Sequence, residues 1–359
     1  MTPFPREDYA SLRVYDPGRV PVPVDLSDNT NLWGPHPVAL ARLRAAAPDD
    51  LRCYPEVYAD TLRTAVARRF GVGVECVTTG AGSDDVLDSA FRAAAAPGAV
   101  VAYPSPTFSM IGDLAHMNGM RPRPVDWADA LADPAVLLEG EPAVVYVCRP
   151  NNPTGGLAPA AWVERLLAQR GAGGPLVVVD EAYADFAGES LIPRAAEVPK
   201  LLVARTCSKA YGLAGLRCGF GIGRPDTVLE VEKSRGPYKV SRLTAEVAAA
   251  ALADTDRWVE RAVAECLGNR HRLRREIAAR GLGQLESHAN FVLMAAPSGS
   301  GAADTKALRE HGVSVRPFTG IPEMGEGLRV TVGPWPLLER FLEALDRRLA
   351  ALESGGVSP

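Results

Sequence analysis

The fold is decided by the stretch Arg205-Thr206-Cys207-Ser208-Lys209-Ala210-Tyr211-Gly212-Leu213-Ala214-Gly215-Leu216-Arg217-Cys218-Gly219-Phe220. A lysine stands in a turn of small residues directly after an apolar run, and an arginine follows eight residues later, where the next apolar run begins. A lysine amine in a closed site can form a Schiff base with an aldehyde, and Ser208 and Arg217 could bind a phosphate beside it. Taken alone, Lys209 could equally be a solvated loop lysine, since reactive lysines are uncommon.

Short apolar runs, rich in valine where they are longest, surround this stretch at residues 76–79, 99–103, 143–148, 175–179, 201–204 and 218–222. Helical patterns lie between several of them, at residues 83–96, 107–118 and 159–169. This alternation predicts an α/β fold with a mostly parallel central sheet. A long helical stretch at 241–280 and weaker strand signals follow, which indicate a smaller α+β part. We expect an N-terminal arm over 1–30, a large domain over 31–240 and a small domain over 241–359.

A second motif, Val177-Val178-Val179-Asp180-Glu181-Ala182-Tyr183, places a carboxylate at the end of a buried strand. Ligand groups of α/β sheets lie at such strand ends. A buried carboxylate needs a cationic partner or shifts its pKa, and a protonated pyridine nitrogen would be such a partner. A structural salt bridge at Asp180 is the alternative.

Two further turns follow apolar runs. Asn152 stands between two prolines in a stiff turn, which by itself is an ordinary feature. The segment Gly80-Ala81-Gly82-Ser83-Asp84 leads into a helix and could bind a phosphate with its amides, although Ser83 and Asp84 could be plain N-caps. A Schiff-base lysine, a phosphate cradle, a carboxylate for a ring nitrogen and donors for a ring hydroxyl together suit pyridoxal 5′-phosphate.

These motifs, in this order, resemble the class I/II aminotransferases of fold type I, and among them most closely the histidinol-phosphate aminotransferases. The resemblance extends over nearly the whole chain. It includes Tyr15, Tyr54-Pro55, Asn290-Phe291 and the stretch Leu328-Arg329-Val330-Thr331-Val332-Gly333. It implies a fold type I enzyme that uses pyridoxal 5′-phosphate to move an amino group from L-histidinol phosphate to 2-oxoglutarate, in histidine biosynthesis.

The resemblance also implies residue roles. Lys209 would hold the cofactor and move the substrate proton, with Asp180 on the ring nitrogen and Tyr183 and Asn152 on the ring 3-oxygen. Arg329 would bind the substrate α-carboxylate. The remaining roles are stacking by Phe108, phosphate binding by Gly82, Ser83, Asp84, Ser208 and Arg217, substrate contacts by Arg316, Tyr15 and Asn29, and a contact from Tyr54 to the neighbouring site of a homodimer.

Several positions depart from the pattern of similar sequences, and we expect all of them at or near the substrate. Thr30 replaces a glutamate, Leu32-Trp33 replaces a proline and a small residue, and Lys239 and Pro334 replace an asparagine and a threonine. Two alternatives therefore stay open. One is an aminotransferase for an aromatic or other amino acid in specialised metabolism. The other is a decarboxylase that resembles threonine-phosphate decarboxylase.

Composition excludes other classes. The chain has 359 residues, is 47% hydrophobic and carries a net charge of -4, so it can bury a large core and has no general attraction to nucleic acid or membranes. Its six cysteines form no CxxC pair, its five histidines show no metal spacing and no apolar leader is visible. We expect a cytoplasmic protein with reduced thiols and no metal.

Overall fold

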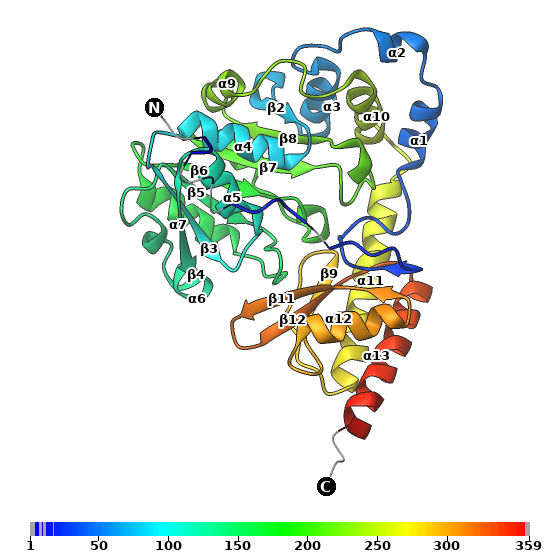
Figure 1. The fold of residues 1–359 in the computed structure, drawn as a ribbon. Coiled ribbons are helices and arrows are strands. Elements are labelled where there is room, and N and C mark those ends of the chain that lie inside the picture. Colours follow the sequence, from blue (N-terminus) through cyan, green and yellow to red (C-terminus); the bar gives the residue numbers. More distant parts are fainter. Residues whose placement is uncertain (1–3, 7–8, 10–11, 17, 356–359) are drawn as a thin grey trace.

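The computed structural model describes residues 4–6, 9, 12–16 and 18–355. Figure 1 shows a larger part built on one central sheet and a smaller part that contains the C-terminal helix. The large sheet has the strand order β2-β8-β7-β6-β5-β3-β4. Its strands are β2 (Val77–Gly80), β3 (Val100–Ser105), β4 (Arg121–Asp126), β5 (Val144–Cys148), β6 (Leu176–Asp180), β7 (Leu201–Thr206) and β8 (Gly219–Gly223).

The predicted α/β fold with a mostly parallel sheet is confirmed. Neighbours from β4 to β7 pair in parallel, whereas β8 runs antiparallel to both β7 and β2. The connection from β7 to β8 holds the lysine loop and no full crossover helix, so the chain reverses there. Strand β4 escaped the sequence pattern because it lies at the sheet edge, where its two prolines are tolerated.

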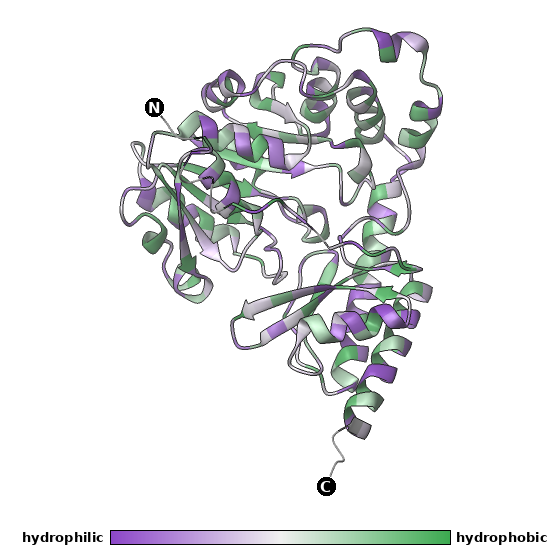
Figure 2. Ribbon diagram, in the orientation of Figure 1, coloured by the Kyte–Doolittle hydropathy of each residue, from purple (hydrophilic) through white to green (hydrophobic). Residues whose placement is uncertain are grey.

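Helices cover both faces of this sheet, because alternate side chains of each strand point to opposite faces. Tyr146 of β5 packs with α4 (Ser83–Ala94), α5 (Met110–Met117) and α9 (Pro225–Ser234). Val145 and Val147 pack on the other face with α7 (Ala160–Arg170). Figure 2 shows apolar colours along the central strands and mixed colours on the helices. The remaining helices before residue 240 are α1 (Pro37–Arg44), α2 (Pro48–Arg52), α3 (Asp60–Phe70), α6 (Trp127–Ala132) and α8 (Ile192–Ala195).

The smaller part contains a three-stranded antiparallel sheet, β11-β12-β9, packed against helices. Its strands are β9 (Phe291–Ala295), β11 (Arg316–Ile321) and β12 (Gly325–Thr331), and its helices are α11 (Trp258–Ala279), α12 (Gly301–Glu310) and α13 (Trp335–Gly355). The N-terminal segment joins it, since β1 (Val24–Asp25) pairs in parallel with β10 (Val313–Ser314). The range 1–30, which we expected to be an arm, therefore contains a strand that belongs to a two-stranded sheet of the smaller part.

The helical stretch expected over 241–280 is wrong as one helix. The structure divides it into α10 (Arg242–Leu252) and α11. Asp254 accepts a hydrogen bond from the backbone N–H of Asp256 at 3.1 Å, and Arg257 adopts a left-handed φ of 56°, so the helix cannot continue. Helix α10 packs with α1 and α3 (Figure 1). We therefore propose that the boundary expected at residue 241 lies after α10.

Candidate active site

A cavity of about 850 Å³ lies between the strand ends of the large sheet and the smaller sheet. Asp180 ends β6, and Lys209 follows β7 in the next loop. Arg316 and Arg329 enter from β11 and β12. Strands β6 and β7 are parallel, so Asp180 and the loop that holds Lys209 lie at the same edge of the large sheet. The predicted site residues that line this cavity are Tyr15, Asn29, Ser83, Asp84, Phe108, Asn152, Asp180, Tyr183, Ser208, Lys209, Arg217, Arg316 and Arg329.

The Lys209 side chain reaches across to the N-terminal segment. Its Nζ donates a hydrogen bond to the backbone carbonyl of Asp28 at 3.1 Å and lies 5.6 Å from the centre of the Tyr183 ring. Desolvation, followed by the positive charge of Arg329, lowers the pKa of Lys209 to about 8. About a tenth of these amines is therefore unprotonated at pH 7, far more than for an ordinary lysine, and the unprotonated form is the one that acts as a nucleophile and base.

The Asp180 carboxylate is held from two sides. Its Oδ2 accepts a hydrogen bond from the Tyr146 hydroxyl at 2.9 Å, and its Oδ1 accepts one from the backbone N–H of Ala182 at 3.0 Å. Burial raises the pKa of Asp180 to about 6, although both hydrogen bonds favour the charged form. No salt bridge to Asp180 occurs within the described parts of the chain. A cation placed against this carboxylate would therefore be stabilised.

Tyr183 belongs to a hydrogen-bond network that joins the two sheets. The Asn29 side-chain amide donates to the Tyr183 hydroxyl at 3.0 Å, and the Thr331 hydroxyl donates to Asn29 Oδ1 at 3.1 Å. Asn290 donates to the Asn29 carbonyl at 3.1 Å. Burial raises the pKa of Tyr183 to about 12. The hydroxyl thus remains protonated at neutral pH and can donate into the cavity.

The start of α4 forms a cradle that fits a phosphate. Ser83 and Asp84 line the cavity, and the preceding Gly82 offers the helix no side-chain cap. A Cβ added to Gly219 would lie 2.2 Å from the Gly82 carbonyl carbon, so β8 can approach this loop only with a glycine. Arg217 borders the cradle and pairs with Asp84 at 3.1 Å. Helix amides beside an arginine suit a phosphate, and Asp84 would contribute its backbone rather than its carboxylate.

Two arginines face each other at the opposite side of the cavity. Arg316 and Arg329 are direct partners in the register of β11 and β12. Arg329 donates to the Ser27 carbonyl at 2.7 Å and to the side-chain oxygen of Asn152, and its buried Nε has no acceptor among the described residues. Desolvation lowers the pKa of Arg329 to about 10. Like charges opposite each other are unfavourable, so this pair favours bound anions.

Comparison with known proteins decides the family. The family model described as aminotransferase class I and II matches residues 21–345, nearly the whole chain. The chain belongs to the class I and II aminotransferases.

Relatives of this aminotransferase have similar lengths and the same fold. The histidinol-phosphate aminotransferase of Aromatoleum aromaticum is 36% identical over 93% of this chain and 96% of the relative. That of Gluconacetobacter diazotrophicus is 37% identical over 90% and 91%. The solved histidinol-phosphate aminotransferase of Sinorhizobium meliloti, in complex with pyridoxal-5′-phosphate, has a TM-score of 0.85, 28% identity and coverage of 96% and 97%.

Two predicted cofactor residues do not line the cavity of their own subunit of this aminotransferase. Tyr54 is 81% exposed, and its ring lies 5.0 Å from the ring of Tyr238. Gly82 lies behind Ser83, where an added Cβ would meet the Arg217 guanidinium at 2.5 Å. Gly82 therefore shapes the cradle, and the reach of Tyr54 to a neighbouring subunit stays a prediction.

Lys239 was expected at the substrate side, and the structure places it elsewhere. Its Nζ pairs with Asp85 Oδ1 at 2.7 Å, and Asp85 Oδ2 accepts the backbone N–H of Ala81 at 3.0 Å. Lys239 thus supports the loop that precedes α4, because Asp85 connects the two. Of the other departures, Thr30 lines the cavity, whereas Trp33 is absent from its lining.

Sequence reasoning missed three residues of the site: Tyr146, Asp28 and Arg19. Tyr146 lies within an apolar run, two residues before Cys148, which pairs in register with Asp180. Side chains two residues apart on a strand share one face, so the Tyr146 hydroxyl lies on the same sheet face as Asp180. This spacing was the signal that could have identified Tyr146. Asp28 and Arg19 line the cavity from the N-terminal segment, where no periodic pattern marks them.

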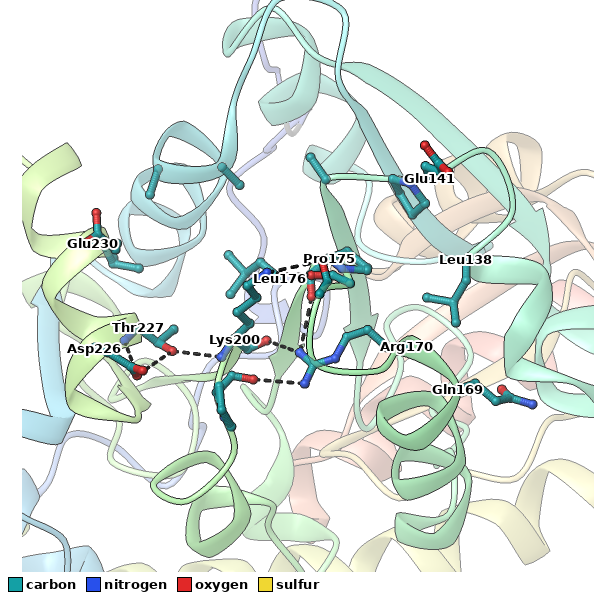
Figure 3. A pocket seen from close by; sticks show the side chains of 18 residues that line it. Leu138, Glu141, Gln169, Arg170, Pro175, Leu176, Lys200, Asp226, Thr227 and Glu230 are labelled. Atoms are coloured by element: carbon teal, nitrogen blue, oxygen red, sulfur yellow. Dashed lines mark hydrogen bonds between the residues drawn. The ribbon is translucent and has the colours of Figure 1, made fainter.

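A second cavity, of about 870 Å³, lies at the opposite ends of the strands, before β6 and β7 (Figure 3). Lys200 Nζ donates to the Gly174 carbonyl at 3.1 Å, and Arg170 donates to the Lys200 carbonyl at 2.7 Å. Both cationic side chains thus donate hydrogen bonds to backbone carbonyls of the loops that precede β6 and β7. The cavity therefore has a structural explanation and receives no catalytic role.

Two features are absent from residues 4–6, 9, 12–16 and 18–355. None of the helices there has the length and apolar character needed to cross a membrane. Within the same residues, no three side chains of His, Cys, Asp or Glu come together as a metal site would require.

Proposed function

We propose that this aminotransferase uses pyridoxal 5′-phosphate to transfer the amino group of L-histidinol phosphate to 2-oxoglutarate, a step of histidine biosynthesis. The products are imidazole-acetol phosphate and L-glutamate. One observation carries the proposal: Lys209, Asp180 and the pair Arg316 and Arg329 share one cavity. The names of the two bacterial relatives and the cofactor in the Sinorhizobium meliloti structure support the substrate and the cofactor.

The residues of the cavity fit the cofactor. The buried Asp180 carboxylate, which has no salt bridge in the described chain, suits a protonated ring nitrogen. The cradle at Gly82 and Gly219 tolerates no Cβ, and the start of α4 beside it, with Arg217, suits a phosphate. When bound, pyridoxal 5′-phosphate supplies an electron sink for a carbanion at the substrate Cα. The residues that would hold it are Gly82, Ser83, Asp84, Phe108, Asn152, Asp180, Tyr183, Ser208, Lys209 and Arg217, with Tyr54 from a second subunit.

Each of these side chains would have a different role in the reaction. Lys209, with a pKa of about 8, would take the proton from the substrate Cα and deliver it to the cofactor carbon that is bonded to the transferred nitrogen. Asp180 is ionised at neutral pH and holds the proton on the ring nitrogen. Arg329 binds the anionic group next to the substrate Cα through a pair of N–H groups. Tyr15, Asn29 and Arg316 would contact the rest of the substrate.

The proposal is tested by glutamate formation. Purified holoenzyme is given 2-oxoglutarate with L-histidinol phosphate, aromatic amino acids or threonine phosphate, and glutamate is measured. We expect histidinol phosphate to be the preferred donor, with no product from the Lys209→Ala control. No glutamate from histidinol phosphate would reject this donor, and carbon dioxide release without loss of 2-oxoglutarate would favour the decarboxylase alternative.

We further propose a homodimer in which Tyr54 completes the site of the other subunit. Tyr54 and Tyr238 form an exposed aromatic pair, and Leu51 nearby is 76% exposed, which suits an interface. Sedimentation should give twice the mass of one chain. Mixing two inactive variants, Tyr54→Ala and Lys209→Ala, should restore about a quarter of the wild-type activity, because half of the dimers are mixed and each has one intact site. Activity of Tyr54→Ala alone at the wild-type level would reject this role.

A further inference from the structure

An ion pair lies on the side of the cavity that β11 and the N-terminal segment line. Asp28 Oδ1 lies 3.2 Å from Arg316 Nη2, and Asp28 Oδ2 contacts Arg19. The side chains of Asp28 and Arg316 are only 16% and 22% exposed. Asp28, Arg19 and Arg316 all line the cavity. A carboxylate of the chain itself therefore lies on the arginine predicted to bind the distal end of a substrate.

The two substrates carry different numbers of anionic groups. L-Histidinol phosphate has one, the phosphate ester beside the amino carbon, and its ring side chain carries none. Glutamate and 2-oxoglutarate have two carboxylates. Arg329 can bind the anion beside the reacting carbon in either substrate, whereas Arg316 gains a second anion only from the dicarboxylate. A partly buried arginine without an anion is unfavourable, so the donor requires another charge near Arg316.

We propose that the Asp28 carboxylate is an internal counter-anion for Arg316, which remains in place when the amino donor binds and is displaced by the distal carboxylate of 2-oxoglutarate. Asp28 is then a specificity-determining residue for the dicarboxylate. This inference rests on the proposed function for the identity of the two substrates, while the ion pair itself is independent of it.

The position of Asp28 in the chain suits such a displacement. Its backbone carbonyl accepts the Lys209 amine at 3.1 Å, and the neighbouring Ser27 carbonyl accepts Arg329 Nη2 at 2.7 Å. The backbone is therefore fixed by two residues of the site, while the carboxylate can rotate about its own side-chain bonds. Arg19, its second partner, is 67% exposed and can follow the carboxylate or turn to solvent.

The test compares two unreactive ligands on the holoenzyme. Glutarate has both carboxylates of 2-oxoglutarate, and butyrate lacks the distal one. Asp28→Asn keeps the size and the backbone carbonyl but removes the competing charge. We expect calorimetry to show glutarate binding about three- to tenfold tighter to Asp28→Asn than to wild type, as the loss of a competing ion pair implies. Butyrate affinity should change less than twofold, since butyrate does not reach Arg316.

Control variants separate this effect from others. Asp346→Asn breaks an ion pair with Arg280 outside the cavity and changes the net charge equally, and it should leave both affinities unchanged. Asp28→Ser is the second variant if Asp28→Asn unfolds. Unchanged or weaker glutarate binding overturns the proposal, and so does an equal gain for both ligands. Neither ligand requires an amino donor, so a failure of histidinol phosphate as substrate would leave this measurement decisive for Asp28.

Discussion

The hydrogen bond from Tyr146 to Asp180 leads to the most direct prediction. A hydrogen bond to a charged group contributes about 1.5–3 kcal/mol, and one between neutral groups about 0.5–1.5 kcal/mol. Tyr146→Phe should therefore destabilise the ionised Asp180 by about 1–1.5 kcal/mol more than the protonated form. This difference corresponds to about one pKa unit. The pKa of Asp180 should rise from about 6 to about 7.

Protein lacking the cofactor and labelled with ¹³C at aspartate carboxyl carbons makes the measurement possible. One resonance should titrate near pH 6 and disappear in Asp180→Asn. In Tyr146→Phe its midpoint should move upward, whereas Tyr103→Phe, on strand β3 and influenced by Asp113 instead, should leave it in place. An unchanged midpoint in Tyr146→Phe would refute the reasoning, because the hydroxyl would then not interact with the ionised carboxylate.

The same shift determines how stability depends on pH. The pKa of Asp180 is higher in the folded chain than the ordinary value of 3.8. Its contribution to the free energy of unfolding is therefore fully present below about pH 4 and is lost as the pH rises through about 6. In Tyr146→Phe the loss should extend to about pH 7 or above. The variant should thus be destabilised more at pH 8.5 than at pH 5.

Three further predictions concern the other parts of the site. Gly219→Ala should weaken cofactor binding at least tenfold in fluorescence titration, because its Cβ would meet Ser83 N at 2.3 Å; Gly215→Ala, with nothing within 4 Å, should bind normally. Arg329→Lys should raise the KM of both substrates by about ten- to a hundredfold, since lysine cannot form a bidentate pair. KM values equal to those of the wild type would contradict this role. In cofactor-free protein, acylation of Lys209 followed by mass spectrometry should show a midpoint near the pKa of about 8; a midpoint near 10.5 would contradict its desolvation.

The sequence predicted most of the large sheet because its central strands are buried on both faces. Continuous apolar runs such as residues 144–148 and 176–179 leave few other interpretations. Strand β4 was missed because it lies at the edge, where solvent permits arginine and proline in the same strand. The division of the helical stretch after residue 252 was missed because alanine-rich segments favour helix throughout. The break is fixed by the local hydrogen bond of Asp254.

The site was predictable where its chemistry lies in local motifs. Asp180 ends β6 and Lys209 lies in the loop that follows β7, so their position follows from the sheet alone. The contact between Asp28 and Arg316 joins residues that are 288 positions apart. No periodic pattern reports such a distant approach, and the arrangement of the two sheets alone determines it. Tyr146 was hidden for another reason, because tyrosine is also an ordinary core residue.

The pairing of β1 with β10 determines when this site can first exist during synthesis. All strands of the large sheet have been made once residue 223 is added, and the helices α9 and α10 that pack on this part follow by residue 252, so it can fold while the ribosome is still adding the rest. The segment with Val24, Asp28 and Asn29 has to wait for β10 and β12, which supply its partners. A nascent chain should therefore bind a phosphate group before it can hold a substrate. The segment from Val24 to Asn29 is thus made early but is among the last to reach its native contacts.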